Sequence, residues 1–232
     1  MSDVESPVSA PTPLIADPAP LGLGGFALTT FVLSVHNANW APDYVWVGLA
    51  LFYGGLSQFM AGMHEFRNRN TFGSTAFTSY GAFWLSLATF MLLIWTKVIP
   101  TTGTGAIDVF KALGFFVLAF AIFNTYMLLW STRVSAAVFT VFLTLEITEI
   151  LLFVGFFLLS GGHLRAGNDI VHFGGYVGVA TAAAAWYASA AGVVNSMAGR
   201  PVLKVGSPLW TDTPAARPAA RMVTGTPPVP QT

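Results

Sequence analysis

Long apolar runs alternate with short polar connections along most of the chain. Crossing the ~30 Å hydrocarbon core of a bilayer takes about 20 apolar residues at 1.5 Å per residue. Runs of roughly this kind cover residues 21–35, 45–66, 74–95, 107–130, 134–160 and 170–195. The pattern predicts an all-α membrane protein, a bundle of six transmembrane helices within residues 17–206. Residues 1–16 and 207–232 are rich in Pro, Ala, Ser or Thr and predict a disordered arm and a disordered tail.

The first run is shorter than the others. Its 15 apolar residues span only about 22 Å as a helix. Asp17 can serve as its N-cap, with Pro18 at the first helical position, where the missing N–H costs little. Two interpretations remain open: a broken span whose freed backbone groups face a solute path, or an ordinary span completed at the interface by residues 36–40.

The second and third runs carry an unusual set of uncharged polar groups. Ala50, Gly54, Gln58 and Gly62 recur every fourth position and share one helical face, which suits close packing in lipid. Hydroxyl groups then open the third run, at Thr75, Thr78, Ser79 and Tyr80. Polar groups at membrane depth are costly unless they are satisfied. We therefore expect this hairpin to line a path for a solute.

The fifth run contains two acidic residues, Glu146 and Glu149, at a depth where apolar residues are expected. Three positions apart on a helix, they share one face. An acid at mid-membrane costs about 2.5–3.5 kcal/mol on insertion scales, so it normally faces the interior. One hypothesis is that one of the pair holds a proton and couples proton to solute movement. The other is that hydrogen bonds to Thr144, Thr148 or a neighbouring helix merely fix the packing.

The sixth run carries small residues in the pattern Gly174-x-x-x-Gly178, followed by Ala182 and Ala185. This pattern lets helix backbones approach closely. We expect tight packing here, within the bundle or between subunits.

Composition supports a membrane protein and excludes several functions. The chain is 54% hydrophobic and only 9% charged, against about 25% charged in ordinary soluble domains. Zero net charge and no basic run argue against nucleic acid. The absence of cysteine excludes disulfides and thiolate metal sites. His64-Glu65 lacks the second histidine of a zinc hydrolase, and no nucleophile elbow or phosphate loop occurs. We expect no enzyme activity, metal or cofactor.

The distribution of basic residues predicts the orientation. Seven of the ten Lys and Arg residues follow the second, fourth and sixth runs: Arg67, Arg69, Arg133, Arg200, Lys204, Arg217 and Arg221. The positive-inside rule then places both termini in the cytoplasm, in a multi-pass protein of the plasma membrane.

Several motifs resemble one known family. The stretches FYGGLSQFMAG (52–62) and NTFGSTAFTSYGAFW (70–84), with Glu65 between them, are similar to the acetate uptake transporter family, which includes bacterial succinate-acetate transporters and fungal acetate permeases. A second family signature, usually Asn-Pro-Ala-Pro-Leu-Gly-Leu, stands here at residues 17–23 with Asp17 in place of Asn. The resemblance covers residues 17–206.

The resemblance implies uptake of acetate and related short-chain carboxylates, extending to succinate, by proton coupling or channel-like passage in a homo-oligomer, typically a hexamer. It also implies a constriction made by Phe26, Tyr80 and a leucine of the fifth helix. Alignment through the Leu-Thr pair gives Leu143, which we adopt, whereas counting back from Gly155 gives Leu145. Candidates for substrate binding are Asp17, Leu21, Gly22, Leu23, Asn37, Gln58, Thr75, Thr78 and Ser79.

Two other functions stay open. One is a pore for ammonium or a neutral small solute, although no paired histidines within the bundle favour it. The other is a membrane sensor or scaffold that does not transport. The Asp17 carboxylate would repel a carboxylate substrate unless protonated or paired, so rate or pH dependence can differ from that of relatives.

Overall fold

The computed structural model describes residues 15–211, and these residues form helices without strands. The elements in chain order are α1 (Ala19–Asn37), α2 (Val45–Leu51), the π-helix η1 (Phe52–Ser57), α3 (Gln58–Arg67), α4 (Thr71–Trp95), α5 (Val109–Ser131), α6 (Ala136–Ser160) and α7 (Leu164–Ala198). Because α2, η1 and α3 are continuous, six helices of the described part are long and apolar enough to cross a membrane. The predicted all-helical, six-span fold is confirmed.

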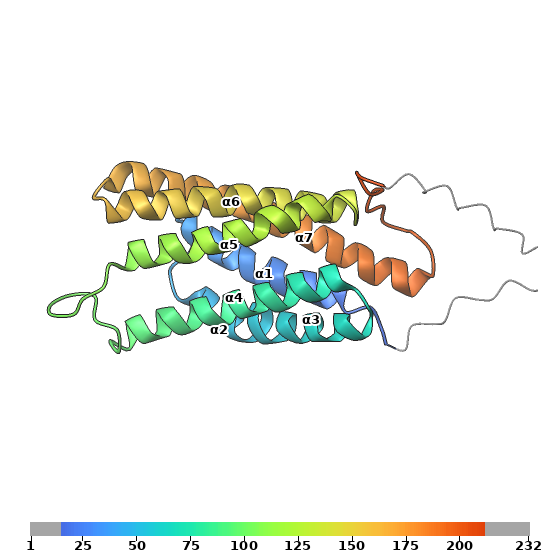
Figure 1. The fold of residues 1–232 in the computed structure, drawn as a ribbon, viewed down its shortest axis with the longest axis horizontal. Coiled ribbons are helices and arrows are strands. Elements are labelled where there is room, and N and C mark those ends of the chain that lie inside the picture. The colour runs from blue at the N-terminus through green and yellow to red at the C-terminus, as the bar shows by residue number, and fades with distance from the viewer. Residues whose placement is uncertain (1–14, 212–232) are drawn as a thin grey trace, which may run out of the picture.

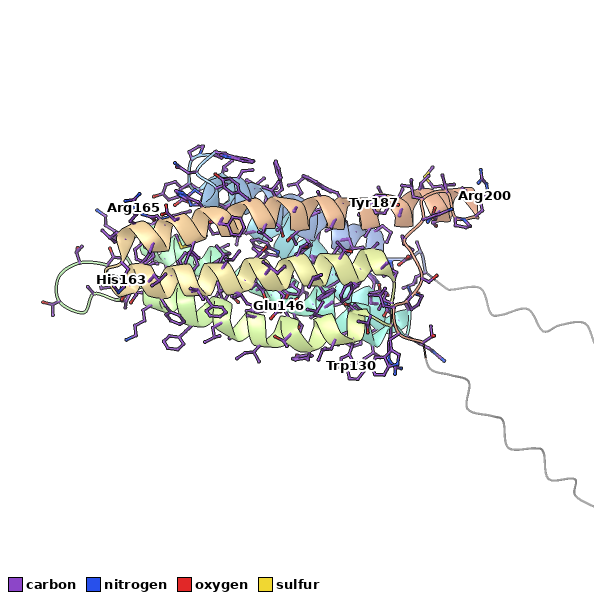
Figure 2. All side chains as sticks on the ribbon, turned by 90° about the horizontal axis from the view of Figure 1, so that it is seen from above. Trp130, Glu146, His163, Arg165, Tyr187 and Arg200 are labelled. Carbon is purple, nitrogen blue, oxygen red and sulfur yellow. The ribbon has the colours of Figure 1, made fainter. Side chains whose placement is uncertain are left out.

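The helices pack into one elongated bundle with α1 in its interior (Figure 1). α1 contacts α7 on one side and the α2–η1–α3 span on the other. Both ends of the described chain lie at the same end of the bundle (Figure 1). That end also carries Arg200, whereas Arg165 lies at the opposite end (Figure 2).

The short first run forms an ordinary, uninterrupted helix. α1 spans 19 residues and ends at Asn37, so the segment after the apolar run completes the span and the broken-helix interpretation is wrong. Its start differs slightly from our expectation, because the first helical residue is Ala19 and Pro18 occupies the N-cap. The Asp17 carboxylate nevertheless accepts a hydrogen bond from the Ala19 N–H at 2.9 Å.

The small residues of α7 pack within the bundle. A Cβ added at Gly175 would collide with the backbone nitrogen of Ala38, and one at Gly178 with Oγ of Ser34, both at the α1 surface. A Cβ at Gly174 would lie 3.2 Å from the side chain of Leu152 in α6. The glycines thus seat α7 against α1 and α6 at close range.

The irregular element of the bundle lies in the second span, where the sequence did not predict it. The six-residue π-helix η1 widens the helix at Phe52–Ser57. A Cβ at Gly54 would lie 2.5 Å from Oγ1 of Thr29 in α1, while Gly62, two turns later, packs against Thr78 of α4. The predicted single small-residue face is therefore shared between two neighbouring helices, because a π-bulge rotates the residues beyond it about the helix axis.

After α7 the chain folds back across the end of the bundle. We call residues 200–211 the C-terminal strap. The N–H of Ala137 bonds to the carbonyl of Val205 at 2.9 Å, and the N–H groups of Leu209 and Trp210 bond to the Thr132 carbonyl at 2.7 and 3.0 Å. The ring of Trp210 stacks on Trp130, 6.0 Å between centroids. Residues 207–211 of the predicted tail are therefore part of this strap; the rest of the predicted arm and tail lies largely outside the described residues.

Candidate functional site

Three apolar side chains meet in the middle of the bundle. Phe26 of α1, Tyr80 of α4 and Leu145 of α6 expose only 4%, 3% and 7% of their surface. The rings of Phe26 and Tyr80 contact edge to face with centroids 5.7 Å apart, a favourable geometry for two aromatic rings. Leu145 belongs to the same buried cluster.

Two small cavities lie on either side of these three side chains. The Glu149 cavity, about 40 Å³, extends from them to Thr30, Trp84 and Glu149. The Gln58 cavity, about 20 Å³, extends to Leu23 and Gln58. Phe26, Tyr80 and Leu145 line both cavities and therefore form a constriction between them.

A wider cavity continues from the Glu149 cavity towards one end of the bundle. Its volume is about 210 Å³, and it shares Leu33, Asn37 and Phe83 with the Glu149 cavity. His36 and Asp43 line its far part, with 3.6 Å between His36 Nε2 and Asp43 Oδ1. Together the cavities make an interrupted path from a polar rim to the constriction.

A chain of hydrogen bonds ties the constriction to α5 and α6. The hydroxyl of Tyr80 donates to Oδ1 of Asn124 at 2.8 Å and lies 3.3 Å from Oε1 of Glu149. Nδ2 of Asn124 donates to the Phe142 carbonyl at 3.0 Å and to Oε2 of Glu146 at 2.7 Å. Glu146 also accepts from Thr125 at 2.8 Å. Figure 2 shows Glu146 about midway along the bundle, so this network lies at membrane depth.

Several buried polar atoms beside the constriction have no hydrogen-bond partner. Oγ1 of Thr30, Nε1 of Trp84 and Oε2 of Glu149 are unpaired, and all three residues line the Glu149 cavity. Oε1 of Gln58 is unpaired, and Gln58 lines the other cavity. Buried polar groups are rarely left unpaired in proteins, so such a cluster at a cavity indicates a place for a polar guest.

The structure brings together part of the predicted site. Phe26 and Tyr80 meet as expected, but the leucine beside them is Leu145. Leu143, which we had adopted, is 38% exposed on the outer surface of α6, so that choice needs correction. Of the binding candidates, Leu23 and Gln58 line the Gln58 cavity and Asn37 lines the Glu149 cavity.

The other three hydroxyl residues predicted on α4, Thr75, Thr78 and Ser79, lie elsewhere. Thr78 packs against Gly62 of α3, and Ser79 lines a shallow outer groove of about 310 Å³ with α5. Neither these two nor Thr75 lines either cavity at the constriction. The helical period explains this, because Ala76 and Tyr80 face inward one turn apart and the hydroxyl positions then point to other sides.

The candidates at the start of α1 also lie away from the constriction. Asp17 is exposed, Leu21 is 47% exposed, and a Cβ at Gly22 would meet the ring of Phe77. Sequence reasoning in turn missed Thr30, Trp84 and Asn124. Asn124 had a usable signal, since it is a lone amide in an otherwise apolar stretch of the fourth run.

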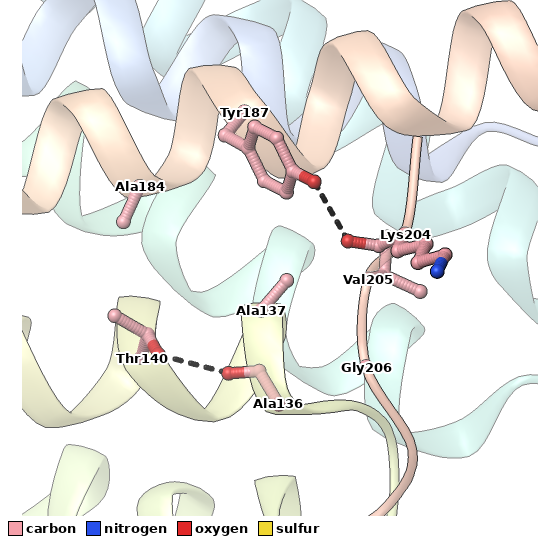
Figure 3. Close-up of a pocket in the computed structure, with 8 residues that line it drawn as sticks. All are labelled: Ala136, Ala137, Thr140, Ala184, Tyr187, Lys204, Val205 and Gly206. Atoms are coloured by element: carbon pink, nitrogen blue, oxygen red, sulfur yellow. Dashed lines mark hydrogen bonds between the residues drawn. The ribbon is translucent and has the colours of Figure 1, made fainter. Parts of the chain in front are cut away.

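A hollow of about 450 Å³ lies beneath the C-terminal strap at the end of the bundle (Figure 3). Its hydroxyl groups bond to the backbone: Tyr187 donates to the Lys204 carbonyl at 2.7 Å and Thr140 to the Ala136 carbonyl at 2.9 Å. With its hydroxyl groups engaged in this way and an otherwise largely apolar lining, this hollow is a gap under the strap and not part of the path.

Six spans around a narrow path with a few unpaired polar atoms, pinched by aromatic and aliphatic side chains, define a helical membrane protein of the solute-transport class. The chain belongs to the GPR1/FUN34/yaaH family, whose model matches residues 4–205.

Individual relatives are transport proteins rather than enzymes. The chain is 35% identical to the succinate-acetate/proton symporter SatP of Escherichia coli K12, over 83% of this chain and 96% of that protein. It is 40% identical to ammonia transport outward protein 2 of Saccharomyces cerevisiae, over 82% of this chain and 66% of that longer protein. The solved structure of the bacterial acetate channel SatP superposes with a TM-score of 0.72 at 36% identity, covering 83% of this chain and 99% of that one.

Proposed function

We propose that this protein carries acetate and related short-chain carboxylates across the plasma membrane, with both termini in the cytoplasm. The observation that carries the proposal is the constriction of Phe26, Tyr80 and Leu145 between two small cavities with unpaired polar atoms. The similarity to SatP, a succinate-acetate/proton symporter and acetate channel by name, supports the same substrate class.

The dimensions of the path favour the smallest acids. A buried water molecule needs about 10–15 Å³ of cavity volume, so a cavity of about 40 Å³ admits a solute of a few heavy atoms. The apolar side chains of the constriction suit the methyl group of acetate. Succinate, with a second carboxylate and a longer chain, would require the constriction to widen.

Two features of the proposal concern mechanism and assembly. Glu146 and Glu149 are the candidates for coupling a proton to acid movement, either by releasing a proton or by binding the acid together with its own proton, because both belong to the hydrogen-bonded chain at the constriction. A homo-oligomer, with a hexamer as the expected state, is inferred from the family resemblance, with one path inside each protomer. Native mass spectrometry of the detergent-solubilised protein measures the number of copies.

Ammonium is the second candidate substrate. The name of the yeast relative favours it, and so do the carboxylates of Asp43 and Glu149 along the cavities, which would attract a cation. The side chains that form the constriction are mostly apolar, which favours a solute with a methyl group over ammonium.

Flux into proteoliposomes distinguishes these possibilities. We expect uptake of radiolabelled acetate above that of protein-free liposomes, with and without an imposed pH gradient. Uptake that follows the gradient indicates proton coupling, and gradient-independent uptake indicates a channel. Uptake of labelled methylammonium but not of acetate would favour ammonium as the substrate. If neither solute is taken up, a sensor or scaffold is the remaining function.

A matched pair of variants ties the flux to the path. Leu145→Trp places a bulky ring in the constriction and is expected to abolish acetate uptake, whereas Leu143→Trp adds the same ring to the outer surface of α6 and should leave it intact. Equal loss in both variants at equal protein level would contradict this route.

A further inference from the structure

The orientation of the Asn124 amide is fixed by its surroundings. One end of the side chain faces the Phe142 carbonyl, which can only accept a hydrogen bond, at 3.0 Å. The NH₂ group must therefore occupy that end, and Oδ1 must face the hydroxyl of Tyr80 at 2.8 Å. Rotating the amide would set two acceptor oxygens against each other.

This orientation determines where the Tyr80 hydrogen goes. Oδ1 of Asn124 has no hydrogen to give, so the phenol must donate its only hydrogen to it. The phenolic oxygen then offers only lone pairs to Oε1 of Glu149, 3.3 Å away. The contact contains a hydrogen only when Glu149 carries it. The network is thus complete with a protonated Glu149, whose proton lies on Oε1.

The other carboxyl oxygen of Glu149 faces the cavity without a partner. With the proton on Oε1, Oε2 is an acceptor. Nε1 of Trp84 is a donor only, and the hydroxyl of Thr30 can donate. Two donors and one acceptor, all buried and unpaired, therefore line one cavity of about 40 Å³.

This set of groups complements an undissociated carboxylic acid. The carbonyl oxygen of such an acid accepts from Trp84 and Thr30, and its O–H donates to Oε2 of Glu149. A carboxylate anion would instead place a lone pair against Oε2. We propose that Thr30, Trp84 and protonated Glu149 form a binding site for the neutral form of a short-chain carboxylic acid, directly beside the constriction; this inference rests on the proposed function.

The consequence for proton coupling is specific. The acid carries its own proton through the site, so one proton accompanies each acid and no net charge crosses the constriction. Glu149 keeps its proton throughout. Tyr80 of α4 lies 3.3 Å from it, and Glu146 lies three residues before it on α6. The neutral Asn124 of α5 bonds to both Tyr80 and Glu146, and the neutral Asn37 of α1 lines the same cavity as Glu149.

Acetamide tests the inference on the wild-type protein without any substitution. It has the shape of acetic acid, a carbonyl acceptor and an N–H donor, and no charge at any working pH. We expect acetamide to compete with labelled acetate for uptake into proteoliposomes, while nitrate, a small planar anion, does not. Acetate uptake that nitrate inhibits and acetamide does not would overturn the neutral-acid site alone; no acetate uptake at all would instead sink the proposed function.

Two matched pairs of variants locate the site. Thr30→Val removes a donor from the cavity and should weaken competition by acetamide roughly fivefold, the value of one hydrogen bond, whereas Thr29→Val removes a buried hydroxyl that packs on Gly54 and should not. Glu149→Gln keeps a neutral acceptor and a neutral donor at this position, so it should lower acetate uptake and competition by acetamide less than Glu149→Leu, which removes both groups. A loss in Glu149→Gln as large as that in Glu149→Leu, with both melting temperatures equal to that of the wild type, would show that Glu149 must release its proton and would contradict the inference.

Discussion

Asn124 is the residue on which the geometry of the constriction most depends. It is fully buried, and its side chain makes hydrogen bonds to Tyr80, Phe142 and Glu146, so it joins α4, α5 and α6 at membrane depth. Aromatic rings surround the Tyr80 ring, and Asn124 accepts the hydrogen bond from its hydroxyl at 2.8 Å. Asn124 thereby helps to fix the position of Tyr80 beside Phe26.

Replacing Asn124 by leucine should therefore destabilise the protein. The substitution removes the 2.8 Å acceptor of the buried Tyr80 hydroxyl and one donor to Glu146, and a buried polar group left without its partner costs about 1–3 kcal/mol. We expect a clear fall in the melting temperature measured in detergent. Thr125→Val, which removes only the second donor to Glu146, should lower it less. A melting temperature of Asn124→Leu equal to that of the wild type would show that the network adds nothing to stability.

Leu145 should limit the size of the acids that pass. Leu145→Ala removes most of a side chain that lines both cavities, so we expect propionate and succinate to compete better with labelled acetate. Leu143→Ala, on the outer surface of the same helix, is the control and should leave the competition series unchanged. If Leu143→Ala alters the series and Leu145→Ala does not, the constriction lies elsewhere.

The residues of the site were only partly predictable from the sequence. Phe26 and Tyr80 could be identified because motifs flank them closely. Leu143 and Leu145 could not be separated, since a shift of two residues turns a helix by about 200° and only packing decides which side faces inward. Thr30 carries no distinctive pattern, because a threonine within an apolar run is equally compatible with the lipid-facing side. Trp84 ends the second quoted motif, but the motif does not tell which side of the helix the indole faces.

At the scale of elements, the π-helix is the feature that shapes the second span. The backbone hydrogen bonds of a π-bulge are weaker than those of an α-helix, so tertiary contacts must compensate for them. Here Gly54 lies close to Thr29 of α1. The apolar pattern defines the six spans well because length and hydropathy alone decide them. The apolar pattern cannot predict the π-helix, because whether a turn takes up an extra residue depends on contacts with the neighbouring helix.

A pair of glycine substitutions in this span separates packing from backbone effects. In Gly54→Ala the new methyl group would lie 2.5 Å from Oγ1 of Thr29, so α1 must shift; overpacking of this kind costs about 1–3 kcal/mol and should also lower acetate uptake. Gly48→Ala, in the same span, meets nothing within 4 Å and should stabilise the helix by about 0.5–1 kcal/mol. Melting temperatures in detergent measure both effects. Equal shifts in the two variants would mean that the close approach of η1 to α1 is unimportant.

The start of α5 and the end of α6 are linked by one exposed side chain. Asp108 caps α5 through the N–H of Lys111 at 2.9 Å and accepts a hydrogen bond from Ser160, the last residue of α6. The hydrogen bond from Ser160, with the capping bond, lowers the pKa of Asp108 below its usual value. Stability from this carboxylate is present above the pKa of the unfolded chain and is lost as the pH falls through the lower pKa of the folded protein.

Asp108→Asn should therefore make the stability of the protein less dependent on pH in the acid range. Asparagine still accepts the capping bond but does not titrate, so the loss of melting temperature on acidification should be smaller than in the wild type. The measurement is a series of thermal melts between about pH 7 and pH 3, a range that brackets the usual carboxyl pKa. Parallel curves for the two proteins would contradict a contribution from Asp108.

For the whole molecule, orientation in the membrane is the property that remains to be measured. The chain contains no cysteine, so a single cysteine introduced at an exposed position is the only reactive thiol. Thr102→Cys, between α4 and α5, should react with a membrane-impermeant maleimide in intact cells. Ser207→Cys, in the C-terminal strap at the opposite end, should react only after permeabilisation, because the excess of basic residues at that end predicts the cytoplasm. The reverse labelling pattern would show that both termini lie on the outer side of the membrane.

The C-terminal strap also fixes the point from which the remainder of the chain departs. Although α7 ends at Ala198, the two bonds to the Thr132 carbonyl and the stacking of Trp210 on Trp130 hold residue 210 beside the turn between α5 and α6. A reporter fused directly after Thr211 is thus tethered nearest to that turn, and energy transfer to a dye there should exceed transfer to a dye at the turn between α3 and α4.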